Sequence, residues 1–142
     1  MKNLLFIATV LVGLSACNMA DDADYKGMAS DMCGCFNDAT AGLSDEGRKA
    51  IEDAGQNDTD MQAALMEYAQ ENPMQAMQDG QVLSSLGEAD VMACISDLEK
   101  KYDDVYTTDS EKEVQDKLME VMKDMKECKL TYAFVKAGLA MQ

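Results

Sequence analysis

The chain of 142 residues contains no histidine and no tryptophan, and Pro73 is its single proline. Histidine is the side chain best suited to acid–base chemistry near neutral pH, and it is also the commonest metal ligand. Its absence removes the usual catalytic triads and most zinc and haem sites. Aspartate, glutamate, lysine and tyrosine are present, but none occurs at a spacing that indicates a catalytic site. We therefore expect no catalytic residue, no resident metal and no cofactor.

Positive charge is also scarce. Twelve lysines and arginines stand against 27 aspartates and glutamates, which gives a formal net charge of −15. Such a chain is repelled by phosphate backbones and by anionic membrane surfaces, so we expect no nucleic-acid partner. The simplest interpretation is a solvated acidic surface, and divalent cations or basic partners are the ligands this charge would attract.

The sequence has one long apolar run, Leu4 to Leu14, which follows the single positive charge of Lys2. Its 11 residues are too few for a helix to cross a bilayer core of about 30 Å. It ends in Leu14-Ser15-Ala16-Cys17, and together these segments resemble the signal peptide and lipobox of bacterial lipoproteins. The resemblance implies that residues 1–16 are removed and that Cys17 is acylated. The alternative is an ordinary secretory signal cut after Ala16.

The residues after Cys17 bear on location. In the best-known sorting rule of that family, an aspartate directly after the cysteine retains the protein in the inner membrane. This chain has Asn18 there, so the resemblance implies the outer membrane. The acidic residues of the 17–24 segment are similar to a surface-export signal, but a polar linker has the same composition. We expect a membrane partner through the lipid on Cys17, and an envelope protein as a candidate partner, with periplasmic and surface exposure both open.

Residues 25–142 read as helical throughout. Alanine, methionine, glutamate, lysine and glutamine fill the periodic stretches, and β-branched residues are sparse. We therefore predict an all-α domain, a small bundle of four or five helices. The clear helices are 25–41, one ending near Asp103, and a last helix over 114–139. A looser middle contains a short helix capped by Ser44 through Ile51, one opened by the Thr59–Gln62 capping box and one opened by Asn72-Pro73, of which one or two are counted in the bundle.

The last helix has the clearest pattern. Apolar residues alternate by four and three from Val114 through Leu118, Val121, Met125, Cys128, Tyr132 and Val135 to Leu139. This spacing predicts one unbroken amphipathic helix. Residues 107–110 precede it as a turn, and two capping boxes are available there, Thr108 with Glu111 and Ser110 with Glu113.

Four cysteines remain when Cys17 is assigned to lipid: Cys33, Cys35, Cys94 and Cys128. An even number in an exported chain favours two disulfides. Residues two apart on a helix are separated by about 200°, so Cys33 and Cys35 flank the apolar stripe and face different neighbours. One helix would thus be joined to two others, and both cross-pairings are open. The alternative is a redox pair within Cys33-Gly34-Cys35.

Thirteen methionines suggest a different chemistry. Met119, Met122, Met125 and Cys128 recur every three residues, and thioether and thiolate ligands select Cu(I). Methionine also fills irregular cores, so we expect core packing and a cost of about 2–5 kcal/mol for cutting Met125 to alanine. The predicted function is a non-enzymatic interaction or structural module of an envelope lipoprotein. Cu(I) binding is the alternative, and thiol–disulfide exchange is the third candidate.

Overall fold

The computed structural model describes residues 21–87 and 89–140, and the predicted signal peptide and Cys17 lie outside them. The described residues form eight α-helices and two 3-10 turns, with no strand among them, so the all-α prediction is confirmed and the helix count is higher than predicted. None of these helices is both long and apolar enough to cross a membrane. The bounds are α1 Asp22–Ala39, α2 Asp45–Gln56, α3 Met61–Glu71, α4 Pro73–Ser84, η1 Ser85–Gly87, α5 Ala89–Lys101, α6 Asp103–Thr108, α7 Glu111–Asp124, η2 Lys126–Cys128 and α8 Lys129–Ala140.

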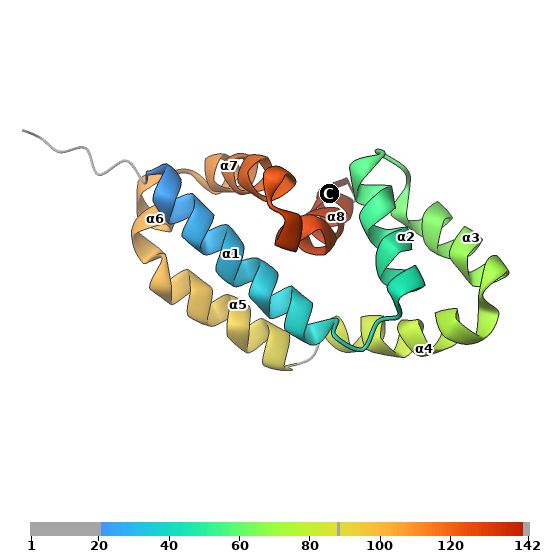
Figure 1. The fold of residues 1–142 in the computed structure, drawn as a ribbon. Helices are drawn as coiled ribbons and strands as arrows, with labels where there is room; N and C mark the ends of the chain where they lie inside the picture. Colours follow the sequence, from blue (N-terminus) through green and yellow to red (C-terminus); the bar gives the residue numbers. More distant parts are fainter. Residues whose placement is uncertain (1–20, 88, 141–142) are drawn as a thin grey trace, which may run out of the picture.

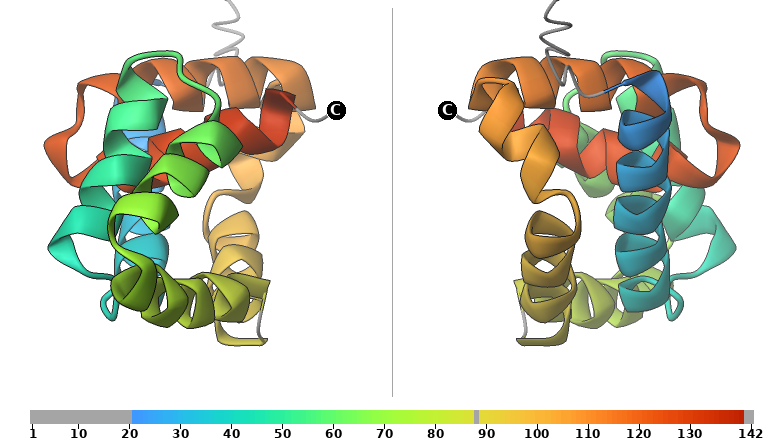
Figure 2. Two further views of the ribbon diagram at one scale, coloured as in Figure 1. Left: turned by 90° about the vertical axis from the view of Figure 1, so that its right-hand side faces the viewer. Right: turned by 90° about the vertical axis from the view of Figure 1, so that its left-hand side faces the viewer.

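The helices form two groups joined by α8 (Figures 1 and 2). In the first group α5 runs antiparallel beside α1, and α6 leads into α7, which also packs on α1. In the second group α2 packs on α3, and α4 returns beneath them toward the end of α1. Because α8 contacts α1, α2 and α7, it connects the two groups.

The first group encloses the larger apolar cluster. Tyr25 and Met28 of α1 pack against side chains of α6 and α7, and the buried members are Tyr25, Met28, Ala29, Cys33, Val105, Val114, Leu118, Met122 and Cys128. We call α1, α5, α6, α7 and η2 the disulfide-linked half. Full burial of side chains of this size is worth about 1.5–3 kcal/mol each, so this cluster is the main source of apolar stabilisation.

The second cluster is smaller. Its buried members are Leu43, Ile51, Leu130 and Ala133, with half-buried side chains from α3 and α4 around them. Tyr68 is the buried residue of α3, and Asp79 is the buried residue of α4. We call α2, α3 and α4 the groove half, because it contributes most of the apolar groove described below.

Both predicted disulfides are present, and the structure selects one of the two pairings. Cys33 is bonded to Cys128 over a sequence separation of 95, and Cys35 is bonded to Cys94 over a separation of 59. The two cysteines of α1 therefore face different neighbours, as their angular separation predicts. One bridge joins α1 to η2 and the other joins it to α5.

The prediction of one unbroken helix over 114–139 is wrong. The chain leaves α7 at Met125, which has extended backbone angles (φ −88°, ψ 120°), and passes through η2 into α8. A straight helix of that length would extend about 38 Å, whereas the break lets α8 fold back across α2. Met125 is consequently half-buried at the break, so the cost of Met125→Ala will lie below the range expected for a core methionine.

Other helix ends also differ from prediction. α1 begins at Asp22, capped by Asp21, and α2 continues through Gly55 to Gln56. Residues 103–108 form the short helix α6, so the chain is still helical at Thr107, where the turn was expected to begin. Asp60 caps α3 in place of Thr59. Of the two boxes before α7, Ser110 with Glu113 is the one that forms.

Candidate functional site

An apolar groove lies between α2, α3 and α8, on the side of the molecule that Figure 2 shows in its left view. Its volume is about 800 Å³, within the range of ligand sites in proteins. α3 contributes larger side chains to it, whereas α2 and α8 contribute mainly alanine and glycine. The lining residues are Ala54, Gly55, Asp58, Thr59, Asp60, Met61, Gln62, Leu65, Met66, Ala69, Ala133, Lys136, Ala137 and Ala140.

The groove exists because α2 and α8 approach closely while α3 stands away from α8. A Cβ atom added at Gly55 would lie 2.5 Å from the Cβ atom of Ala133, a distance that real side chains do not reach. Glycine is therefore required at this crossing. Along α8 the groove is lined by Ala133, Ala137 and Ala140, whose methyl groups are too short to fill the space between α8 and α3.

Polar contacts around Lys136 form part of the groove lining. Its ammonium donates to the Gly55 carbonyl at 2.8 Å and to the carboxylate of Asp58. The first contact places a cation at the carboxyl end of α2, whose last turn has no basic residue of its own. Asp58 has φ 54°, a left-handed conformation that aspartate tolerates, and the hydrogen bond from Lys136 lowers the pKa of its carboxyl. Lys136 is thus already paired with protein groups.

A buried carboxylate holds the groove half together. Asp79 of α4 is 3 % exposed, and it accepts hydrogen bonds from the Ser44 amide at 2.9 Å, the Ser44 hydroxyl at 2.6 Å and the Tyr68 hydroxyl at 2.6 Å. Ser44 also caps α2 through the Gly47 amide. This network joins α4 to the start of α2 and to the middle of α3. A Cβ atom at Gly47 would lie 2.1 Å from Asp79, so glycine is needed beside the carboxylate.

The surroundings of Asp79 keep it ionised. Burial disfavours the charged form, but the hydrogen bonds from Ser44 and Tyr68 outweigh burial, and the pKa of Asp79 is lowered. Burial and the bond to Asp79 raise the pKa of Tyr68, which stays protonated as the donor. Because three donors already occupy this carboxylate, the network is suited to positioning helices rather than to proton transfer.

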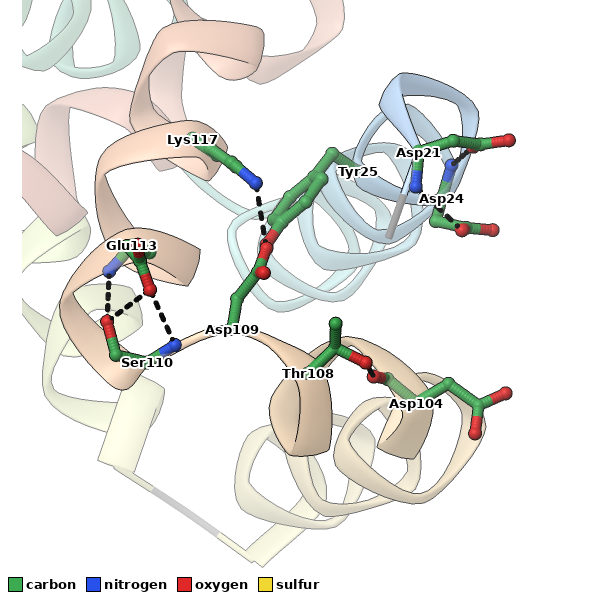
Figure 3. A network of polar contacts seen from close by, with 9 residues as sticks. All are labelled: Asp21, Asp24, Tyr25, Asp104, Thr108, Asp109, Ser110, Glu113 and Lys117. Atoms are coloured by element: carbon green, nitrogen blue, oxygen red, sulfur yellow. Dashed lines mark hydrogen bonds and ion pairs between the residues drawn. The ribbon is translucent and has the colours of Figure 1, made fainter. Parts of the chain in front are cut away.

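A second polar network lies at the opposite end of the molecule (Figure 3). The Tyr25 hydroxyl of α1 donates to Asp109 at 2.5 Å, and Lys117 of α7 donates to the same carboxylate at 2.8 Å. Burial and the bond to Asp109 raise the pKa of Tyr25, and the bonds from Lys117 and Tyr25 lower the pKa of Asp109. The contacts tie the start of α1 to the loop between α6 and α7.

The same direction holds wherever the surroundings move a pKa among the described residues: carboxyl pKa values fall, and tyrosine and lysine pKa values rise. Each change stabilises the charge state that the group already has at pH 7. An efficient general acid or base needs a pKa moved toward the working pH, which is the opposite direction. The affected groups are Tyr25, Asp31, Asp58, Tyr68, Asp79, Lys101, Tyr102, Tyr106, Asp109, Lys112, Glu113 and Lys117.

The sulfur atoms considered for Cu(I) have other roles in the structure. Cys128 is bonded to Cys33, so its thiolate is not free, and Met122 is buried in the larger cluster. Met125 and Met119 are half-buried beside that cluster, and the Met125 Sδ lies 3.9 Å from the Cys128 Sγ. Within residues 21–87 and 89–140, no three acidic or cysteine side chains are grouped so that they could hold a metal ion.

Sequence reasoning did not identify the groove or the Asp79 network. The groove depends on the separation of α3 and α8, which are distant in the chain. The network does leave a signal, because Asp79 shares a helix face with Ala76, Val82 and Leu83, at spacings of three and four. An acidic residue on an apolar face indicates a buried, hydrogen-bonded carboxylate. No protein-family model matches the chain, and no curated protein or solved structure is similar to it.

Proposed function

We propose that this protein is a lipid-anchored lipoprotein of the outer membrane whose helical domain is a non-enzymatic binding module, with the groove between α2, α3 and α8 as its binding surface. The observation that carries the proposal is the groove itself, about 800 Å³ of open volume with mostly apolar walls. Apolar surface that remains open to solvent on a folded domain commonly marks a binding site.

The charge states of the described residues support a binding role over catalysis. The two polar networks, around Asp79 and around Tyr25, have their donors and acceptors matched within the protein. Their tyrosines and carboxylates are held in their ordinary protonation states. Such networks contribute to stability and to helix position, and they leave the groove as the surface available to a ligand.

The anchor is supported by the sequence. Leu14-Ser15-Ala16-Cys17 resembles a lipobox, and α1 begins at Asp22, five residues after Cys17. The helical domain would then lie close to the membrane. Cys17→Ala should abolish labelling with fatty acid and partitioning into detergent, and labelling of this variant would contradict the anchor.

The groove can be tested with Nile red, a neutral dye whose fluorescence rises in apolar sites. The oxidised protein should bind it, and Ala137→Phe should abolish binding because the larger ring fills the groove. Ala63→Phe is the matched control, since Ala63 is exposed on the solvent side of α3 and outside the groove. Equal binding by all three proteins, or no binding by the wild type, would contradict the proposed surface.

Cu(I) binding and thiol exchange rank below this proposal because they need free thiolates. Cys33, Cys35, Cys94 and Cys128 are bonded in pairs, and thioethers alone are weak ligands. Competition with a Cu(I) chelator, run on oxidised and reduced protein, separates the cases. Tight binding by the oxidised form that is lost on replacing Met119, Met122 or Met125 would favour copper handling.

A further inference from the structure

Given the proposed binding function of the groove, we infer that its ligand is a cationic amphipathic helix of a partner protein. Two features of the structure lead to this class of ligand. The walls of the groove are mostly apolar and include Met61 and Met66, and the part of the chain that forms the groove half contains few basic residues. The apolar walls fit apolar anchor side chains of a ligand. The scarcity of basic residues favours a ligand with basic side chains around those anchors.

The apolar wall of α3 fits the spacing of a helical ligand. Met61, Leu65 and Ala69 follow one another at four-residue intervals, with Met66 beside them. Residues 61–69 extend about 12 Å along the axis, which is a little over two turns and accommodates anchors at i, i+4 and i+7 of a partner helix.

Methionine makes this wall adaptable. Its unbranched thioether side chain adjusts to differently shaped partners, and it is common on surfaces that bind several helical targets. Met66 is 59 % exposed, and Met74 and Met77 on the neighbouring α4 are 78 % and 67 % exposed. Met66 lines the groove, so a partner that enters the groove would cover it, whereas Met74 and Met77 lie outside the lining.

The charge pattern selects a cationic partner. No lysine or arginine occurs in residues 50–99, so α3 and α4 carry none. Residues 44–84 contain nine acidic and two basic residues, which gives this segment a formal charge of −7. A field of this sign attracts basic side chains and repels carboxylate and phosphate groups.

The basic residues of α2 and of the groove lining have partners within the protein. Arg48 donates to the Thr40 carbonyl at 3.0 Å, and Lys49 lies 3.9 Å from Asp53. Lys136, the one cation among the lining residues, is occupied by Gly55 and Asp58. Lys123 and Lys129 line a separate depression of about 310 Å³ that shares Gly55, Asp58 and Lys136 with the groove. The excess of carboxylates therefore belongs to the α3 side of the groove.

Carboxylates are placed beside the apolar wall. Asp60 is on the rim of the groove, where it caps α3 through the Ala63 amide. Glu67 and Glu71 lie on the other flank of α3, at least about 100° around the helix from Met66 and Ala69, where they line a depression of about 390 Å³ between α2 and α3. The depression and the groove share Ala54 and Thr59, so they adjoin near the end of α2. A basic side chain of a ligand in the groove can meet Asp60 directly, and a long one that crosses α3 would reach Glu67 and Glu71.

The test uses two synthetic peptides of one amphipathic helical pattern, one with leucine and lysine and the other with leucine and glutamine. Fluorescence anisotropy with the oxidised full chain should give an affinity at least about tenfold higher for the lysine peptide at low salt, with the difference shrinking as salt is raised. The lysine peptide should displace Nile red, and Ala137→Phe should abolish peptide binding.

Two triple variants separate local recognition from general attraction to an acidic protein. Asp60→Asn, Glu67→Gln and Glu71→Gln remove three charges from α3 and its N-cap while keeping a side chain that can cap α3. Asp38→Asn, Glu99→Gln and Glu120→Gln remove three exposed charges from α1, α5 and α7. The first triple should weaken binding of the lysine peptide several-fold more than the second.

Each remaining outcome overturns the inference in a recognisable way. Equal losses in the two triples would show that net charge alone attracts the peptide, and equal affinity for the two peptides would show that charge plays no part. Displacement of Nile red by palmitate but not by the lysine peptide would identify a lipid ligand. In these three cases Nile red still binds the groove, so the proposed function stands, whereas failure of Nile red to bind would overturn that function itself.

Discussion

α1 is covalently joined to two other elements, whereas α3 and α4 are held in place by packing and by the hydrogen bonds of Asp79. The disulfide-linked half has both bridges and nine buried residues in its cluster. Residues 44–84 of the groove half contain no cysteine, and α3 and α4 bury Tyr68 and Asp79. The apolar groove lies on the side with the weaker attachment.

This difference indicates that the disulfide-linked half is rigid and that the groove half is adaptable. Segments with few buried apolar contacts open locally at lower free energy than segments in the centre of a core. A binding surface on such a segment can adjust to its ligand, and the cross-linked half keeps the rest of the domain in place.

Removing the buried bridge should have the largest effect. Cys33→Ala with Cys128→Ala should lower the free energy of unfolding by about 3–4 kcal/mol, because the unfolded chain regains the entropy of a long loop. Denaturant titration under oxidising conditions measures the change. Cys35→Ala with Cys94→Ala is the comparison, and its loss should be smaller because Cys94 is only half-buried. The reverse order would contradict the assignment of the main core to the first bridge.

Truncating a methionine to alanine should cost more stability in the disulfide-linked half than in the groove half. Met122 is 1 % exposed in the larger cluster, so Met122→Ala should cost about 3 kcal/mol through lost burial and a cavity. Met66 lines the open groove, so Met66→Ala should change stability by less than about 0.5 kcal/mol. Thermal or denaturant unfolding of the two variants gives the comparison. Similar costs would mean that the groove is closed in solution.

Asp79→Asn should loosen the groove half selectively. The amide cannot accept all three hydrogen bonds, and at least one buried donor is left without a partner, at a cost of about 2 kcal/mol. Hydrogen exchange should accelerate in α3 and α4 while protection in α1 and α7 is retained. Uniform acceleration across all helices would show that the two halves unfold as one unit.

The smallest expected effect is the change with pH in the stability difference between wild type and Asp79→Asn. Because the folded pKa of Asp79 is lowered, its ionisation stabilises the native state above the ordinary aspartate pKa of about 3.9. This contribution is lost as the pH falls through the folded pKa. The difference in stability between wild type and Asp79→Asn should therefore be constant from about pH 7 to pH 5 and should narrow below about pH 4. A constant difference down to pH 3 would mean that folding leaves the pKa of Asp79 unchanged.

The sequence contains enough information for the fold class and for the role of α1. Helical periodicity predicts an all-α domain, and the angle between Cys33 and Cys35 predicts one helix bridged to two others. Both predictions depend on local geometry, which a sequence expresses directly. The predicted helix caps Ser44 and Ser110 also depend on local geometry, and both are confirmed.

The features that were missed depend on contacts between distant segments. The break at Met125 has neither proline nor glycine to mark it, and it arises because α8 packs across α2. The helix predicted to end at Ile51 continues through Gly55, where Ala133 of α8 approaches too closely for any larger residue. The groove is the space that these two contacts leave between α3 and α8, so no single stretch of sequence encodes it.

The nesting of the two bridges has a mechanical consequence. The Cys35–Cys94 loop lies entirely within the Cys33–Cys128 loop, and it contains α2, α3 and α4. Tension applied between the two ends of the chain would pass from α1 through the Cys33–Cys128 bond into α8. Residues 34–127, including the groove half, would carry no load while that bond is intact. Under tension the oxidised protein should lengthen only by the chain outside the bridge, and reduction should release the remainder.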